Sequence, residues 1–212
     1  MSLSRKSILI ILLILVADQT LKILVKTHMT LYQQIPMFGQ WGILHFVENN
    51  GMAFGLALPG SLGKILLTSF RIIAVVAIAF YLRHLIRENA HQGLIITLSM
   101  VLAGALGNII DSVFYGIIFN ESTPLEAASL FPQGGGYAPL LHGKVVDMFY
   151  FPIIKGTYPE WFRGGADFIF FRPVFNLADS SITVAVFIIL FRQKRYFAHA
   201  APPGDEEPGT GT

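Results

Sequence analysis

Residues 8–25 read ILIILLILVADQTLKILV, an apolar run in which only Asp18 and Lys22 carry a charge. As a helix, a run of this length covers about 27 Å, close to the ~30 Å hydrocarbon core of a bilayer. The preceding Arg5 and Lys6 look like the start of a signal peptide, but no small-x-small cleavage pattern follows. We therefore predict a retained transmembrane helix.

The composition of the whole chain agrees with that prediction. Of its 212 residues, 53% are hydrophobic and only 13% are charged, and the mean hydropathy is +0.59. Soluble domains run nearer a quarter charged, so a water-soluble globule could not hide this much apolar surface. The net charge of +2 comes from basic residues at the ends of apolar runs, which indicates membrane orientation and not a nucleic-acid partner. The absence of cysteine excludes thiol catalysis, thiolate metal sites and disulfides.

Three further apolar runs cover residues 65–82, 94–114 and 174–191. We predict an α-helical membrane protein with four transmembrane helices. Basic residues flank the short loops and the termini: Arg5, Lys6, Arg83, Arg87, Arg192, Lys194 and Arg195. By the positive-inside rule both termini are cytoplasmic, and residues 26–64 and 112–173 lie outside.

The outer segments carry their own structural signals. Residues 43–54 begin with β-formers and turn at Asn49-Asn50-Gly51, which predicts a small extracytoplasmic sheet or cradle. The long loop between the third and fourth helices contains Gly134-Gly135-Gly136 and many aromatics, typical of an interfacial belt or an apolar groove. We expect one integral-membrane domain over residues 1–201 and a disordered tail over 202–212.

Polar residues inside the predicted helices need partners, because lipid offers none. Asp18 and Lys22 are four apart, so they either neutralise each other or support a functional site near the outer end of the helix. Asn108 and Asp111 are three apart and point to more than helix packing. Arg71 falls within the second run, where we expect a structural role with its side chain reaching toward the outer interface.

Two more aspartates lie at the same predicted depth, the outer membrane interface. Asn176 and Asp179 start the fourth run, where they either cap a helix or serve a site. Asp147 is flanked by Val, Met and Phe, so a turn explains it less well. Two carboxylates brought together can share one proton, which is the basis of aspartic-protease chemistry.

Five motifs, in this order, resemble the bacterial lipoprotein signal peptidase (signal peptidase II) family. They are Asp18-Gln19-x-x-Lys22, Asn49-x-Gly51-x-Ala53-Phe54, Gly104-Ala105-Leu106-Gly107-Asn108-x-x-Asp111, Val145-Val146-Asp147 and Phe175-Asn176-x-Ala178-Asp179-Ser180. The resemblance implies an intramembrane aspartyl endopeptidase of the bacterial cytoplasmic (inner) membrane. Such an enzyme removes the signal peptide from a prolipoprotein just before its diacylglyceryl-modified cysteine.

Carried over motif by motif, the resemblance makes Asp147 and Asp179 the catalytic pair. It also implies a set of residues that bind substrate or shape the site: Asp18, Lys22, Asn49, Gly51, Asn108, Asp111, Asn176 and Ala178. The implied partners are lipid-modified prolipoproteins, membrane lipids and globomycin-like inhibitors. No cofactor is implied, and the six histidines lack the spacing of a metal motif.

The chain departs from the family pattern in two places. Ser112 stands where the family usually has an arginine, so a guanidinium at the site would have to come from Arg71, Arg163 or Arg172. The stretches before and after Asp147 are also longer than usual, and we expect the extra residues to form a lid or surface excursion beside the site.

Other functions remain open from the residues themselves. Intramembrane Asp and Lys also mark ion pathways, so a proton-coupled small membrane transporter is the alternative, although a relay across the bilayer is missing. A serine–lysine protease would use Ser180 or Ser112 with Lys144 or Lys22. Lys22 would be a poor base, because Asp18 one turn earlier holds it protonated.

Overall fold

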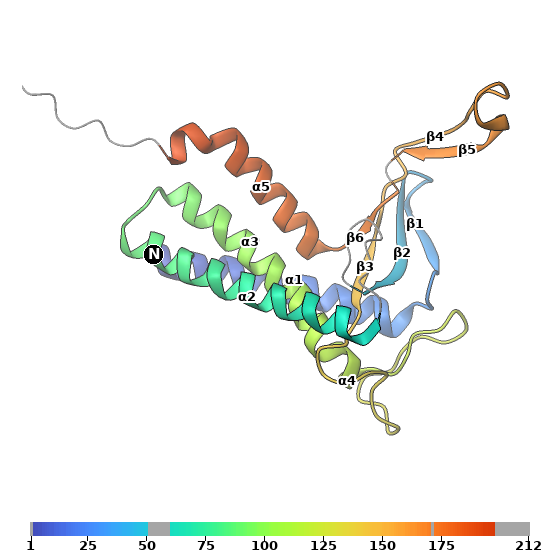
Figure 1. Ribbon diagram of the computed structural model, residues 1–212, viewed down its shortest axis with the longest axis horizontal. Helices are drawn as coiled ribbons and strands as arrows, with labels where there is room; N and C mark the ends of the chain where they lie inside the picture. Colours follow the sequence, from blue (N-terminus) through green and yellow to red (C-terminus); the bar gives the residue numbers. More distant parts are fainter. Residues whose placement is uncertain (1, 51–59, 171, 198–212) are drawn as a thin grey trace, which may run out of the picture.

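A computed structural model describes residues 2–50, 60–170 and 172–197 (Figure 1). The helices are α1 (Leu3–His28), α2 (Gly60–Arg87), α3 (Gln92–Ile110), the π-helical turn η1 (Asp111–Tyr115), α4 (Gly116–Ile118), the 3-10 turn η2 (Arg163–Gly165) and α5 (Leu177–Tyr196). The strands are β1 (Gln34–Phe38), β2 (Gly42–Asn49), β3 (Val145–Tyr150), β4 (Ile154–Thr157), β5 (Asp167–Phe170) and β6 (Val174–Phe175). The predicted tail over 202–212 and Gly51 lie outside the described residues.

Three helical segments are long and apolar enough to cross a membrane: Leu3–His28, Leu62–Arg87 and Gln92–Ile118. They confirm the predicted runs at 8–25, 65–82 and 94–114 and extend each of them. α5 does not meet the same criterion, because Asp179 lies in its first turn and Arg192, Lys194 and Arg195 lie near its end. The fourth crossing therefore stays a prediction.

The start of the fourth helix was predicted too early. Helix α5 begins at Leu177 and not at Val174, because Asn176 has an extended backbone and is the N-terminal cap of the helix. Val174 and Phe175 instead pair with Tyr150 and Phe149 of β3. Their β-branched and aromatic side chains suit a strand, and hydropathy alone could not separate them from the helix that follows.

Helix α3 lies at the centre of the bundle and packs against α1, α2 and α5. The polarity of the bundle is inverted relative to a soluble protein. Large apolar side chains face outward, with Val16 64% and Phe80 70% exposed, whereas Asp18, Lys22 and Asp111 are fully buried. Such an arrangement suits lipid, because lipid accepts the apolar surface and the polar groups must pair inside.

A four-stranded antiparallel sheet in the order β1-β2-β3-β6 stands at one end of the helices (Figure 1). It confirms the predicted small sheet, although β1 was not foreseen. Phe46, Val146 and Met148 are fully buried in a cluster with Met29 and Tyr115, which fixes the sheet against α1 and η1. The second, two-stranded sheet β4-β5 is a hairpin that projects beyond this end of the molecule.

The stretch between α4 and β3 carries the glycine triplet and returns along η1 and α4. Backbone N–H groups of Leu141 and Gly143 donate to the carbonyls of Val113 and Ser112, at 3.1 and 2.9 Å. These N–H groups satisfy carbonyl oxygens near the end of the helix, where the backbone has no further intrahelical N–H group to donate. A Cβ at Gly143 would collide with the carbonyl of Asp111, so this close return depends on glycine. Whether the stretch also acts as a lid stays a prediction.

Candidate active site

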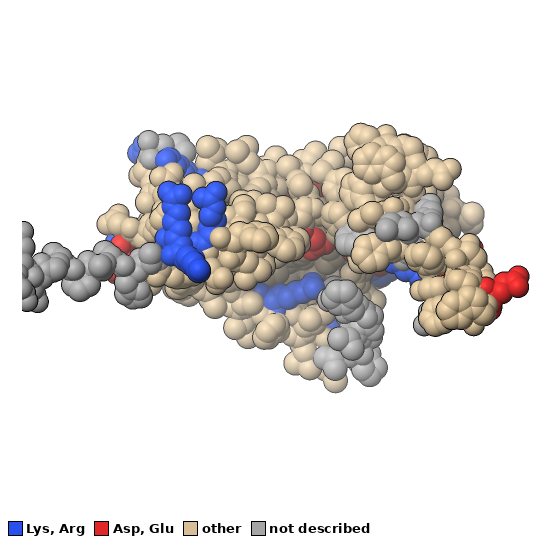
Figure 2. Space-filling view, turned by 90° about the horizontal axis from the view of Figure 1, so that it is seen from above, with Lys and Arg blue, Asp and Glu red and all other residues tan. Residues whose placement is uncertain are grey.

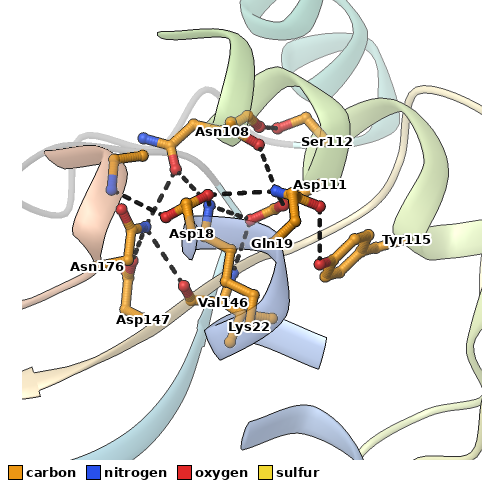
Figure 3. A network of polar contacts seen from close by, with 12 residues as sticks. Asp18, Gln19, Lys22, Asn108, Asp111, Ser112, Tyr115, Val146, Asp147 and Asn176 are labelled. Carbon is orange, nitrogen blue, oxygen red and sulfur yellow. Dashed lines mark hydrogen bonds and ion pairs between the residues drawn. The ribbon is translucent and has the colours of Figure 1, made fainter. Parts of the chain in front are cut away.

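Lys22 is the centre of a buried ionic cluster between α1, α3 and η1 (Figure 3). Its ammonium lies 2.8 Å from Asp18 Oδ2 and 2.8 Å from Asp111 Oδ2, and it donates to Asn108 Oδ1 at 3.0 Å. A charge removed from water needs such partners, because the desolvation cost is several kcal/mol per ion. Asp18 and Lys22 thus form the ion pair that was one of the two alternatives, and their further contacts join three elements.

The same cluster reaches the sheet and α5 through backbone groups. Asp111 Oδ2 accepts from Val146 N at 3.3 Å, and Asp18 Oδ1 accepts from Ala178 N at 2.9 Å. Gln19 donates to Asp111 Oδ1 at 2.9 Å and accepts from the Tyr115 hydroxyl at 3.1 Å (Figure 3). The residues beside Asp147 and Asp179 are therefore both held by carboxylates of the Lys22 cluster.

The structure brings Asp147 and Asp179 together around Asn176. The amide of Asn176 donates to Asp147 Oδ1 at 2.7 Å, and its backbone N–H donates to Asp179 Oδ2 at 3.3 Å. Asn108 donates to Asp179 Oδ1 at 2.8 Å, and Asn49 donates to Asp147 Oδ2 at 3.3 Å. The two carboxyl groups each lie one hydrogen bond from the same residue, although they are 32 positions apart in the sequence.

Asn176 and Asp179 also form the helix cap that their spacing suggested. Asn176 Oδ1 accepts from Asp179 N at 2.9 Å, and the two residues complete a capping box at the start of α5. The cap and the site are not exclusive readings. Because the cap fixes both side chains, it holds Asp179 at the residue that also donates to Asp147, while it satisfies the helix end.

Asp147 is 4% exposed, and its environment disfavours the ionised form. Burial first, and next the charge of Asp179, raise the pKa of the Asp147 carboxyl to about 7. Hydrogen bonds from Asn49 and Asn176 act in the opposite direction, because they favour the carboxylate. At neutral pH the pair can therefore hold one proton, and perturbed carboxyl groups of this kind occur at catalytic sites.

Glycines let the helices approach closely enough to form the site. A Cβ at Gly104 would collide with the carbonyl oxygen of Ala178, and one at Gly107 would lie 2.7 Å from Asp18 Oδ2. The small-residue stripe on α3 is thus both a packing surface for α5 and space for a buried carboxylate.

A cavity of about 250 Å³ opens beside Asp179 between α2, α3 and α5. Arg71, Asn108 and Asp179 line it together with apolar side chains such as Val75 and Ile182. In the space-filling view the surface is hollowed near the middle, and acidic and basic side chains both lie in the hollow (Figure 2). The charge of Arg71 interacts with Asp179 and, more weakly, with Asp147.

Arg71 is thus the one of the three candidate arginines that the structure places at the cavity. Arg172 is exposed, and the side chain of Arg163 lies outside the described residues. Ser112, for which the resemblance implies an arginine, is buried and donates to the Asn108 carbonyl at 2.9 Å.

The contacts of the serines and lysines do not assemble the serine–lysine pairs considered above. The Ser180 hydroxyl donates to the Asn176 carbonyl at 2.9 Å, and Lys22 is held by two carboxylates. Lys144 pairs with Glu48 at 3.2 Å and with Glu121 at 3.5 Å.

A second buried ionic cluster, which sequence reasoning missed, holds β2 in place. Lys26 pairs with Glu48, and Ser122 donates to the same carboxylate at 2.8 Å. Burial alone would raise the pKa of Glu48, but the charge of Lys26 and these hydrogen bonds bring it below its usual value. Glu48 precedes Asn49, so this cluster fixes the end of β2 that reaches Asp147. The sequence signal for this cluster was Lys26, a second lysine one turn after Lys22 on the same face of α1.

Gln19 and Tyr115 were not among the predicted site residues either. Gln19 follows Asp18 directly, and Tyr115 is four residues after Asp111, a spacing that places neighbours on one helix face. The π-helical backbone of η1 widens that turn, so a helical wheel alone would not predict the contact between Tyr115 and Gln19.

Comparison with protein families gives a match over most of the chain. The family described as Signal peptidase (SPase) II matches residues 10–194. A lipoprotein signal peptidase of Porphyromonas gingivalis (strain ATCC 33277) is 50% identical over 184 residues, which cover 85% of this chain and 79% of the relative. That of Amoebophilus asiaticus is 37% identical over 191 residues, 87% of this chain and 76% of the relative.

Solved structures show a similar fold. One bacterial membrane enzyme, solved by the in meso method at 2.3 Å resolution, aligns with a TM-score of 0.60 and 24% identity over 94% of each chain. Another, solved at 1.9 Å, aligns with a TM-score of 0.57 and 25% identity over 88% of this chain and 91% of that one.

Proposed function

The chain belongs to the signal peptidase II family, and from that premise we propose that Asp147 and Asp179 perform the hydrolysis of a lipoprotein signal peptidase. The enzyme is a membrane protease that acts on lipoprotein precursors. The single observation that carries the catalytic assignment is the convergence of the two carboxyl groups on Asn176, with a pKa near 7 for Asp147.

The proposed mechanism starts from one proton shared by the pair. Like charges this close cannot both ionise cheaply, so one carboxyl stays protonated and the other accepts a proton from water. The water attacks the scissile carbonyl, and the protonated carboxyl donates a hydrogen bond to the developing oxyanion. A proton then passes to the leaving amine, and the pair returns to its starting state.

The neighbouring amides have a positioning role in this mechanism. Asn108 and Asn176 donate hydrogen bonds to the carboxyl oxygens. Because an amide brings no charge, the proton shared by the two aspartates remains available for exchange. Asn49 comes from β2 and donates to the other oxygen of Asp147. Asp18, Lys22 and Asp111 act one step further away, because they hold Asn108, Ala178 and Val146 in place.

We propose that the cavity beside Asp179 receives the segment around the scissile bond. Its apolar lining suits small apolar side chains, and Asp179 and Asn108 provide the polar end. Arg71 lies on the α2 wall and supplies the positive charge that the family pattern places at Ser112. A guanidinium there can hold a substrate carbonyl or moderate the negative charge of the pair.

The proposed location is the bacterial inner membrane, with both termini cytoplasmic and the carboxyl pair at the outer leaflet interface. The basic flanks of the short loops favour that orientation. A signal-peptide helix could enter between the helices while the diacylglyceryl chains of a prolipoprotein stay in lipid. Globomycin-like cyclic peptides are expected to inhibit by occupying the same cavity.

Asp147→Asn and Asp179→Asn test the assignment. Each variant should lower cleavage of a diacylglyceryl-modified precursor in detergent by about 10³-fold or more, the scale seen when a catalytic group is removed. Asp167→Asn is the matched control, because Asp167 is exposed on β5 and bonds only Thr157 among the described residues. Ser180→Ala should cost far less than either.

Cleavage by Asp147→Asn or Asp179→Asn at a tenth of the parent rate or better would refute the catalytic pair. Proton flux into proteoliposomes without any peptide product would favour the transporter alternative, which membership of this family does not support.

A further inference from the structure

We propose that the groove between α1 and α2, at the end of the helices far from the carboxyl pair, binds an anionic phospholipid. The groove has a volume of about 570 Å³. Ser4 and Ser7 of α1 and Arg83 and Arg87 of α2 form its polar end. Isoleucine, leucine, valine, alanine and phenylalanine side chains form the rest.

The two arginines supply a binding site for a phosphate. Arg83 and Arg87 are four residues apart, so they project from the same face of α2. Neither forms an ion pair within the part of the chain that the structure describes, and both are exposed. Basic side chains gather at the end of the helices opposite the sheet (Figure 2). Like charges side by side are stabilised when an anion joins them, and guanidinium groups bind phosphate with paired hydrogen bonds.

Ser7 gives an independent indication of a ligand. It is 2% exposed, and its hydroxyl has no hydrogen-bond partner among the described residues, although it lines the groove. A helical serine usually donates to the carbonyl one turn earlier, and a buried hydroxyl without a partner is costly. A phosphate or glycerol oxygen at the polar end of the groove would satisfy it.

The apolar part of the groove matches an acyl chain of one leaflet. From Arg87 to Val76 the wall of α2 covers about 16 Å, about half of the ~30 Å hydrocarbon core. The lining residues come from α1 and α2 alone, and α3 packs against both of these helices. Arginines at the polar end and an apolar wall of this depth together describe a phospholipid, whereas a free phosphate would make no use of the wall.

The charge of the groove selects an anionic lipid. None of its described lining residues is acidic, so nothing there would pair with the cationic group of a zwitterionic headgroup. A second copy of the chain is a poorer occupant, because its own arginines would face these two across the same membrane depth.

Native mass spectrometry of the full chain in detergent tests the proposal. Phosphatidylglycerol should remain bound at concentrations where phosphatidylcholine with the same acyl chains does not. Arg83→Gln with Arg87→Gln should weaken phosphatidylglycerol binding about tenfold or more, since each basic residue near a phosphate contributes about 1 kcal/mol. Lys194→Gln with Arg195→Gln removes the same charge from the end of α5, outside the groove, and should change binding less than twofold.

Two further variants separate the parts of the site. Ser7→Ala should weaken binding of phosphatidylglycerol without changing the net charge. Ala79→Phe should fill the apolar part of the groove and displace the lipid while it leaves both arginines in place. Glycerol phosphate, which has the anion and lacks the chains, should not compete. Unchanged precursor cleavage by each variant shows that it is folded.

Equal binding of the two lipids by the parent protein would overturn the proposal. Equal losses in the two double variants would do the same, because they would indicate a general attraction to basic surface. Competition by glycerol phosphate would reduce the site to a phosphate site without an acyl chain and would also contradict it.

Discussion

Two pairs of carboxyl groups lie beside each other in this protein and differ in what they bind. Asp18 and Asp111 share the ammonium of Lys22, at 2.8 Å from each. Asp147 and Asp179 accept hydrogen bonds from the amides of asparagines. We call the first set the Lys22 cluster and the second the carboxyl pair. Both sets consist of aspartates, but only the Lys22 cluster contains a cation that balances their charge.

The difference teaches which carboxyl groups can do chemistry. A fixed ammonium stabilises the charge of the Lys22 cluster, so its protons do not need to move. An amide donates a hydrogen bond but no charge, so in the carboxyl pair a proton takes part of the role that Lys22 has in the other set. The pKa of about 7 for Asp147 follows from burial and from the charge of Asp179.

Removal of the cation should break the Lys22 cluster and give the largest loss of stability. Lys22→Met leaves two buried carboxylates without their ammonium, and we expect a loss of about 3–5 kcal/mol in the free energy of unfolding. Thermal unfolding in detergent measures it. Lys194→Met, at an exposed lysine in the last turn of α5, is the control and should leave the melting temperature unchanged. Equal melting temperatures for the two variants would contradict a structural role for the cluster.

The close packing of α3 against α5 joins the Lys22 cluster to the carboxyl pair. The variant Gly104→Ala tests this packing. The new methyl group would collide with the carbonyl of Ala178, so we expect a loss of about 1–3 kcal/mol together with reduced cleavage. Gly134→Ala is the matched control, because no atom lies within 4 Å of the added Cβ. A parent-like melting temperature for Gly104→Ala would show that the helices can separate at little cost.

The pH dependence of cleavage should report the carboxyl pair and not the Lys22 cluster. Asp147 is protonated below its pKa of about 7 and ionised above it, so activity should fall as pH rises through about 7. Asn49→Ala removes a hydrogen bond that favours the carboxylate, so the alkaline limb should move to higher pH, by about half a unit to one unit. A shift to lower pH would mean that Asn49 does not act through Asp147.

An effect of similar size to that at Asn49 is expected at Arg71, which brings a positive charge near the carboxyl pair. Arg71→Gln should lower kcat/KM for precursor cleavage about tenfold, equivalent to about 1.4 kcal/mol. Arg71→Lys should retain part of the activity, and Arg71→Gln with Ser112→Arg tests whether a guanidinium from η1 can replace the one from α2. If Arg71→Gln cleaves like the parent, the cation has no part in the reaction.

Much of the fold followed from hydropathy. The apolar runs identified three long helices, and the β-formers before Asn49 identified a strand of the small sheet. The error at Val174 arose because apolar residues suit a strand and a membrane helix equally, and only pairing with β3 decided between them. β1 was missed because its residues are all exposed and show no buried side of an alternating pattern.

The sequence by itself determined that this chain needs lipid around it and that its few acidic residues are exceptional, because residue types fix the cost of removing a side chain from water. It could not decide which carboxyl group meets which partner. Asp18 meets Lys22 across one helical turn, whereas Asp147 and Asp179 meet only because β3 and the start of α5 converge on Asn176. That choice depends on distances between segments far apart in the chain, and tertiary packing alone sets those distances.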